Sequence, residues 1–272
     1  MTLKKQKLLI SFLVFGYAFL YAPILTLVVF SFNASQALTS WGGFSTRWYQ
    51  SLIHNENILN AAWLSLKIAF MTANIAVTLG TIAALVAVRF RTFKGRAFFN
   101  SIVTAPLVMP DVMTGLALLM MFVMTQQIWG WPAQRGMSTI MLGHATISIA
   151  YVLVIVRARL AEFDPQLEEA ALDLGARPLT VFWRITLPLI APSIAAGWLL
   201  AFTLSLDDVV LASFLSGPGT TTLPMVVFSS IRFGISPEIN ALATIIVSMV
   251  AIGVILAGIV MNKSASRLRG RN

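Results

Sequence analysis

Long apolar runs separated by more polar connections dominate the chain. Each run reaches the roughly 18 residues that a helix rising about 1.5 Å per residue needs to cross a hydrocarbon core about 30 Å thick. The pattern predicts an all-α, polytopic membrane protein with six transmembrane helices, and we expect residues 1–272 to form a single transmembrane domain. The predicted spans cover residues 8–32, 59–88, 97–124, 137–156, 187–206 and 239–261. The first run is longer than the apolar core of a signal peptide, so we expect it to be a retained span.

Composition supports a lipid environment. The chain is 58% hydrophobic and only 11% charged, whereas about a quarter of the residues of a soluble domain are charged. The formal net charge of +9 is compatible in principle with a nucleic-acid partner, because Lys and Arg neutralise phosphates. The position of the basic residues therefore has to decide between nucleic acid and membrane.

Lys and Arg are concentrated in alternate connections between the spans. The remaining connections hold only Arg47, Arg135 and Arg232. This asymmetry is typical of the positive-inside rule for a protein with six spans and both termini in the cytoplasm. It argues for membrane lipid as the surroundings and against nucleic acid as a partner.

The predicted cytoplasmic connection between the fourth and fifth spans, residues 157–186, contains signals for two short helices. Asp164 followed by Pro165 is a favourable helix start, with a capping carboxylate and proline at the first helical position. Gly175 ends this helix, because glycine takes the left-handed conformation after a helix without steric penalty, and Pro178 begins a second helix. One apolar stripe at helical spacing lies between these signals, formed by Leu167, Ala170, Ala171 and Leu174. Periodicity alone favours a linker that merely covers the helix ends.

The residues of this connection carry a more specific signal. They include, at fixed spacing, Glu169, Ala170, Ala171, Gly175, Ile185, Leu187 and Pro188. The set resembles the EAA motif of ABC importer permeases. The resemblance implies the type I ABC importer permease fold, with residues 157–186 docking on a cytoplasmic ATPase subunit. The chain lacks a G-x-x-x-x-G-K-[ST] phosphate-binding loop, so we expect no cofactor on this chain and ATP with Mg²⁺ on the partner ATPase.

Three carboxylates fall in the outer half of the predicted spans: Asp111, Asp207 and Asp208. Ionisable groups within spans are costly and commonly mark a substrate pathway. A cluster of anionic groups near the entrance favours a cationic substrate. The alternative is structural pairing, in which Lys67 or Arg232 neutralises a carboxylate and Asp207 or Asp208 caps a helix.

Aromatic residues near these carboxylates are candidates for the same pathway. Trp198, Phe202 and Tyr151 can make cation–π contacts with an ammonium group, although aromatic residues in spans more often serve packing. His144 is expected to be a neutral, hydrogen-bonded packing residue. The sequence has no cysteine, no metal-ligand spacing and no nucleophile with a nearby base, so we expect neither a metal site nor an enzyme.

A second resemblance runs from the first predicted span to the sixth. The matching segments are residues 109–112, 204–208, 217–219, 222–224 and 236–244, with residues 45–49 and 130–132 closest to the putrescine branch. They are similar to the permeases of spermidine/putrescine ABC importers. The resemblance implies a bacterial inner-membrane complex with a second nonidentical permease, a homodimeric cytoplasmic ATPase and a periplasmic polyamine-binding protein.

A different class of transporter is also compatible with the residues. An ion-gradient-driven carrier or a channel for small organic cations can use aspartates within its spans. The two hypotheses differ in the source of energy, because only the importer needs an ATPase.

Overall fold

The computed structural model describes residues 3–36, 40–90, 92–233 and 236–252. Apart from an isolated β-bridge between Asn33 and Phe44, regular structure in these ranges is helical. The helices long and apolar enough to cross a membrane are Leu9–Phe30, Glu56–Arg89, Asp111–Trp129, Met137–Glu162 and Pro178–Asp207. The predicted all-α, multi-span class is therefore confirmed. The chain divides into two compact units, Met1–Leu59 with Ser229–Asn272, and Asn60–Phe228, which we describe separately.

The first unit contains α1 (Leu3–Phe30), α2 (Arg47–His54), the start of α3 (Glu56–Arg89) and a helix at Pro237–Ile252. The apolar window of α1 has no buried residue, as suits a helix whose partners are lipid or other chains. Asn33 is buried and shapes the loop after α1, since its side-chain oxygen accepts from the Gly42 N–H at 2.7 Å. The end of the predicted sixth span, residues 253–261, lies outside the described residues.

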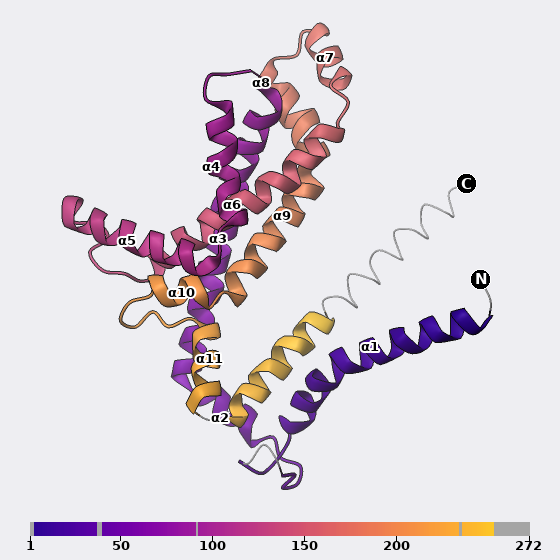
Figure 1. Ribbon diagram of the computed structural model, residues 1–272, viewed down its shortest axis with the longest axis vertical. Helices are drawn as coiled ribbons and strands as arrows, with labels where there is room; N and C mark the ends of the chain where they lie inside the picture. The colour runs from indigo at the N-terminus through magenta and orange to yellow at the C-terminus, as the bar shows by residue number, and fades with distance from the viewer. Residues whose placement is uncertain (1–2, 37–39, 91, 234–235, 253–272) are drawn as a thin grey trace. The chain divides into compact units, whose positions relative to one another are not determined.

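The second unit is built on α3, α6 (Met137–Glu162) and α9 (Leu187–Asp207), with α6 packed along α9 (Figure 1). Small residues on α3, including Ala76, Gly80 and Ala84, let α6 approach closely. A Cβ atom at Gly80 would lie only 2.8 Å from the Cβ of Val152. This close contact between α3 and α6 therefore depends on the absence of a side chain at Gly80.

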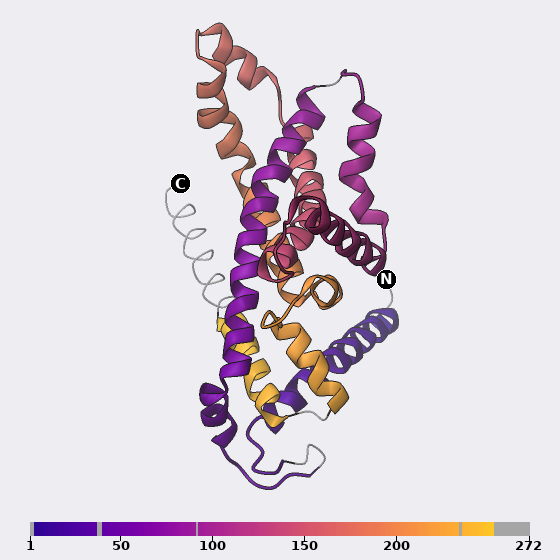
Figure 2. The same cartoon turned by 90° about the vertical axis from the view of Figure 1, so that its left-hand side faces the viewer.

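The predicted third span, residues 97–124, is divided by the structure into α4 (Arg96–Val108) and α5 (Asp111–Trp129). Met109 and Pro110 have extended backbone, with ψ of 136° and 139°. Proline has no N–H to donate and disfavours helical backbone at the residue before it. The chain changes direction at this point (Figures 1 and 2), which makes Asp111 the first residue of a new helix.

The connection at 157–186 forms α7 (Gln166–Asp173), α8 (Pro178–Val181) and the π-helical turn η1 (Phe182–Thr186). Gly175 takes a φ of 83°, as predicted for the residue that ends the first helix. The Gly175 N–H bonds to the Leu172 carbonyl and the Ala176 N–H to the Ala171 carbonyl, the Schellman arrangement.

The second helix of this connection differs from the prediction. Instead of a separate short helix, α8 and η1 continue directly into α9 as one apolar helix from Pro178 to Asp207. The widened η1 turn ends two residues before Pro188, which cannot donate a backbone hydrogen bond. The second unit also holds α10 (Val210–Leu215), and the short helix α11 (Leu223–Phe233) follows it in the chain.

Candidate functional site

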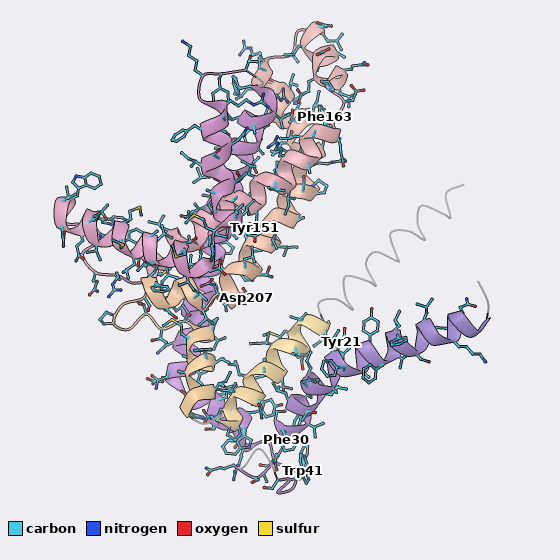
Figure 3. All side chains as sticks on the ribbon, viewed as in Figure 1. Tyr21, Phe30, Trp41, Tyr151, Phe163 and Asp207 are labelled. Atoms are coloured by element: carbon cyan, nitrogen blue, oxygen red, sulfur yellow. The ribbon has the colours of Figure 1, made fainter. Side chains whose placement is uncertain are left out.

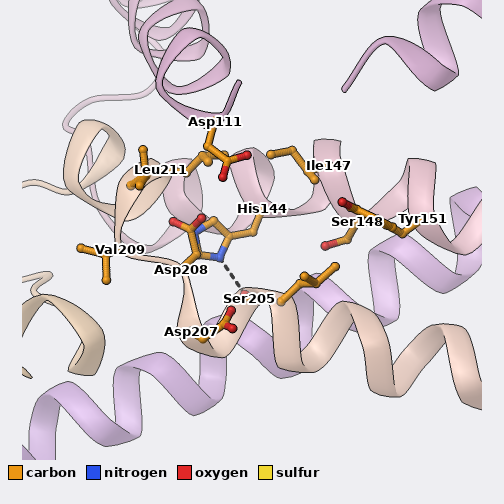
Figure 4. Close-up of a pocket in the computed structure, with 12 residues that line it drawn as sticks. Asp111, His144, Ile147, Ser148, Tyr151, Ser205, Asp207, Asp208, Val209 and Leu211 are labelled. Atoms are coloured by element: carbon orange, nitrogen blue, oxygen red, sulfur yellow. Dashed lines mark hydrogen bonds and ion pairs between the residues drawn. The ribbon is translucent and has the colours of Figure 1, made fainter. Parts of the chain in front are cut away.

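A hollow of about 390 Å³ lies at the junction of α9 and α10 (Figure 4). Helix α9 ends at Asp207, and the chain runs through Asp208 and Val209 before α10 begins. The start of α5 and the middle of α6 complete the walls. The polar side chains that line the hollow are Asp111, His144, Ser148, Tyr151, Ser205, Asp207 and Asp208.

The three carboxylates singled out in the sequence share this hollow. Asp111 reaches it from the first turn of α5, and Asp207 and Asp208 from the end of α9. Asp208 also caps a helix, because its Oδ1 accepts the Ala212 N–H at 3.1 Å, as expected of one member of the adjacent pair. The helix break at Pro110 and the break after Asp207 together create an anionic concavity.

His144 joins the site although sequence reasoning assigned it to packing. The ring is buried, and its Nδ1 lies 2.7 Å from the Ser205 hydroxyl (Figure 4). The other nitrogen, Nε2, faces Asp208 with 3.5 Å to Oδ1 and has no hydrogen-bond partner within the described ranges. A buried ring nitrogen without a hydrogen bond is costly unless a ligand or water completes it. The chain carries no local signal for this role, because both partners come from other helices.

The predicted aromatic residues separate into two groups. Tyr151 lines the hollow. Trp198 and Phe202 do not; they stack on each other with ring centroids 5.1 Å apart and pack against the core of α3, α6 and α9. Within the second unit, Asp207 lies toward the end away from α7, Phe163 lies near α7, and Tyr151 lies between them (Figure 3).

Lys67, which the alternative interpretation pairs with a carboxylate, makes an aromatic contact instead. The Lys67 Nζ lies 5.1 Å from the centre of the Trp63 ring, a cation–π distance. The side chain of Arg232, the other proposed partner, lies outside the described residues. Among the described side chains that line the hollow, the acidic groups are these three carboxylates.

The opposite end of the second unit presents the predicted ATPase-coupling residues. Glu169, Ala170, Gly175 and Pro188 are exposed, whereas Ala171, Ile185 and Leu187 are half-buried. Large apolar side chains beside them face outward, with Leu174 89%, Leu179 72% and Trp183 59% exposed. An apolar surface of this kind on an otherwise polar connection is typical of a protein interface.

Comparison with known proteins decides the family. Residues 76–270 match the model of the binding-protein-dependent transport system inner membrane component family. The chain belongs to this family. The predicted permease is thus confirmed, as a multi-pass inner-membrane component of a transport system and not an enzyme.

Two relatives resemble the permease along most of its length. The putrescine transport system permease protein PotI of Escherichia coli strain K12 is 58% identical over 243 residues, covering 89% of this chain and 86% of PotI. The spermidine/putrescine transport system permease protein PotC of the same strain is 39% identical over 244 residues, covering 90% of each chain.

Solved structures agree with the fold of the permease. A chain of a bacterial ABC transporter involved in the import of the acidic polysaccharide alginate aligns with a TM-score of 0.71, covering 95% of this chain and 96% of that chain. The same kind of transporter in complex with a pentasaccharide-bound periplasmic protein aligns with a TM-score of 0.68 and covers 92% of this chain and 91% of that chain. With identities of 19% and 18%, these alignments concern the fold alone.

Proposed function

We propose that the chain is the pore-forming subunit of an ATP-driven importer that moves polyamine, chiefly putrescine, from the periplasm to the cytoplasm. The observation that carries the proposal is the convergence of Asp111, Asp207 and Asp208 on one hollow. A diamine carries two positive charges at neutral pH, and a concavity lined by carboxylates attracts it. The names of the two relatives, which specify putrescine and spermidine, support the same substrate class.

Within the hollow, each polar residue has a distinct task toward an ammonium group. The carboxylates of Asp111 and Asp207 accept charge-assisted hydrogen bonds. Neutral His144 offers Nε2 as a further acceptor if its Nδ1 carries the proton and donates to Ser205. The Tyr151 ring supplies a cation–π surface on the wall of the hollow. Trp198 and Phe202 then support the wall of the path by packing behind it.

At the other end, the segment 157–186 docks on the ATPase. Its exposed residues Leu174, Leu179 and Trp183 supply apolar contact area, and the small side chains of Ala170 and Ala171 allow close approach. The residues that resemble the coupling motif, Glu169 to Gly175 with Ile185, Leu187 and Pro188, surround this surface. ATP and Mg²⁺ bind to that partner, since this sequence has no phosphate-binding loop.

The complete importer in this proposal has four kinds of subunit. This permease pairs with a second, nonidentical permease, a cytoplasmic ATPase homodimer supplies the energy, and a periplasmic polyamine-binding protein delivers the substrate. Both termini of the chain lie in the cytoplasm, as the distribution of Lys and Arg favours. The family and the relatives support this importer over an ion-gradient-driven carrier.

Transport in a defined system tests the proposal. Proteoliposomes that contain both permeases and the ATPase, with ATP inside and binding protein outside, are expected to accumulate labelled putrescine. Vesicles that lack this chain are the control. Uptake driven by an imposed proton gradient without the ATPase would contradict the proposal and support the carrier.

A further inference from the structure

Glu168 is the buried side chain of an otherwise exposed helix. Within α7, which the structure describes in full, Glu168 alone is buried, with 6% of its surface exposed, although it directly precedes the predicted coupling residue Glu169. The neighbouring apolar residues Leu167 and Leu172 are exposed. Helix α7 is therefore held by a polar contact and not by a buried apolar face, and its exposed apolar side chains remain open to a partner.

The contacts of Glu168 join three helices. The guanidinium of Arg89, the last residue of α3, donates to its Oε1. The hydroxyl of Thr186, the last residue of η1 directly before α9, donates to the same oxygen. Thr186 is itself buried, and the side chains around this contact include Leu85, Leu172 and Phe182. One carboxylate therefore connects the cytoplasmic ends of two long helices with α7.

The helix dipoles and the burial of the carboxylate both strengthen the contact between Glu168 and Arg89. Arg89 lies at the C-terminal end of α3 and Glu168 in the first turn of α7, so each charge is favourable for the dipole of its own helix. The Glu168 side chain is only 8% exposed, whereas that of Arg89 is 44% exposed. The pair is therefore half-buried, and loss of its partners leaves a costly buried charge on Glu168. A surface ion pair such as that of Arg159 with Glu162, whose side chains are 49% and 71% exposed, has neither property.

We propose that Glu168 is a positioning residue for energy coupling, which attaches α7 to the ends of α3 and α9 so that displacement of α7 by the ATPase moves both helices together. The proposal rests on the proposed function, in which α7 docks on the ATPase. Helix α7 is also linked to α9 through the glycine turn at 175 and through its packing on α8 and η1. The ion pair with Arg89 attaches it to the end of α3. Without the carboxylate, α7 can move with the ATPase while α3 lags behind.

The test measures uptake per ATP hydrolysed in proteoliposomes of the complete importer. The variants are Glu168→Gln, Arg89→Gln and the double variant, with Glu56→Gln, an exposed carboxylate in the first turn of α3, as the matched control. We expect Glu168→Gln to lower putrescine uptake about tenfold while ATP hydrolysis stays within about twofold of the parent, a size typical of coupling energies between sites. The double variant is expected to be no worse than either single variant, because both remove the same contact.

Parallel loss of uptake and ATP hydrolysis would overturn the proposal, since it would give Glu168 a purely structural role, and so would unchanged uptake per ATP. If the Glu168→Gln complex fails to assemble, Thr186→Val is tested instead, because it removes one hydrogen-bond donor to Glu168 and keeps the ion pair. A partial fall in uptake per ATP hydrolysed by this variant supports the proposal. Unchanged uptake per ATP, or failure of this variant to assemble, contradicts it. Absence of ATP-dependent putrescine uptake by the parent complex would instead reject the proposed function.

Discussion

Asp208 shows how one residue serves both fold and site. Its Oδ1 caps α10 through the Ala212 N–H and also faces His144 across 3.5 Å, while its side chain lines the hollow with Asp111 and Asp207. Capping needs only an oxygen acceptor, which asparagine also has, whereas attraction of a cation needs the negative charge. The two roles can therefore be separated by substitution.

We predict that Asp208→Asn raises the half-saturating putrescine concentration about tenfold, equivalent to about 1.4 kcal/mol, and leaves the thermal stability of the purified complex nearly unchanged. Asp208→Ala is expected to show the same transport defect and to lose about 1 kcal/mol of stability with the cap. Uptake kinetics and thermal unfolding in detergent measure the two effects. Normal uptake by Asp208→Asn would make this carboxylate structural.

His144 permits a test of hydrogen-bond acceptance in the same hollow. We predict that His144→Gln lowers putrescine uptake, because the longer amide cannot hold both the contact with Ser205 and an acceptor facing Asp208. His144→Asn, whose amide can replace Nδ1, is expected to keep the contact with Ser205 yet also to lose affinity. Equal putrescine uptake by the parent, His144→Gln and His144→Asn would assign His144 to packing alone.

At the scale of the helix, Gly175 sets the direction of the chain after α7. With its φ of 83°, a β-branched residue is strained at this position, although a Cβ atom would meet no neighbour within 4 Å. Gly175→Val is expected to uncouple ATP hydrolysis from uptake, whereas Gly175→Asn, which tolerates the left-handed conformation, is expected to retain most transport. Both rates are measured in proteoliposomes, and wild-type uptake by the valine variant would reject the coupling role of this turn.

The contact between α3 and α6 has a sharper steric requirement. A side chain at Gly80 would place Cβ 2.8 Å from Val152, so we expect Gly80→Val to destabilise the fold by about 1–3 kcal/mol through overpacking. Gly16 on α1 has no atom within 4 Å of the same position and provides the matched control. Thermal unfolding in detergent compares Gly80→Val with Gly16→Val, and equal midpoints would disprove the close contact.

Sequence patterns predict single helices better than the contacts between them. Run length predicts the fifth span at 187–206, which agrees with α9 at Leu187–Asp207, although the continuous helix already begins at Pro178. The division of the third span was missed because an apolar composition continues through Pro110, and a proline can either kink or end a helix. His144 depends on Ser205 and Asp208. Glu168 depends on Arg89 and Thr186. These partners are distant in sequence and come close only when the helices pack.

At the scale of the whole molecule, charge placement predicts the orientation in the membrane. We expect green fluorescent protein fused after Asn272 to fluoresce and alkaline phosphatase at the same site to be inactive, because both termini are cytoplasmic in this topology. Phosphatase inserted in the outer connection near Trp131 is expected to be active. An active phosphatase fusion at the C-terminus would contradict this topology. It would also contradict the assignment of residues 157–186 to the side of the membrane where the ATPase binds.

The two ends of the second unit contain the parts that an importer must connect. The α9–α10 junction gathers the carboxylates, and α7 with its exposed leucines lies at the other end of the same helices. Helices α6 and α9 run between these ends and share one apolar core with α3. A displacement of α7 can therefore reach the anionic hollow through elements that pack as one unit.

Substrate-stimulated ATP hydrolysis by the co-purified complex tests this account most directly, because it requires the hollow and the ATPase to communicate through this chain. With the binding protein present, putrescine is expected to stimulate hydrolysis more than spermidine, and 1,4-butanediol, which has the length of putrescine without its charges, is expected to have no effect. Stimulation by the diol equal to that by putrescine, or no stimulation by any polyamine, would contradict the account.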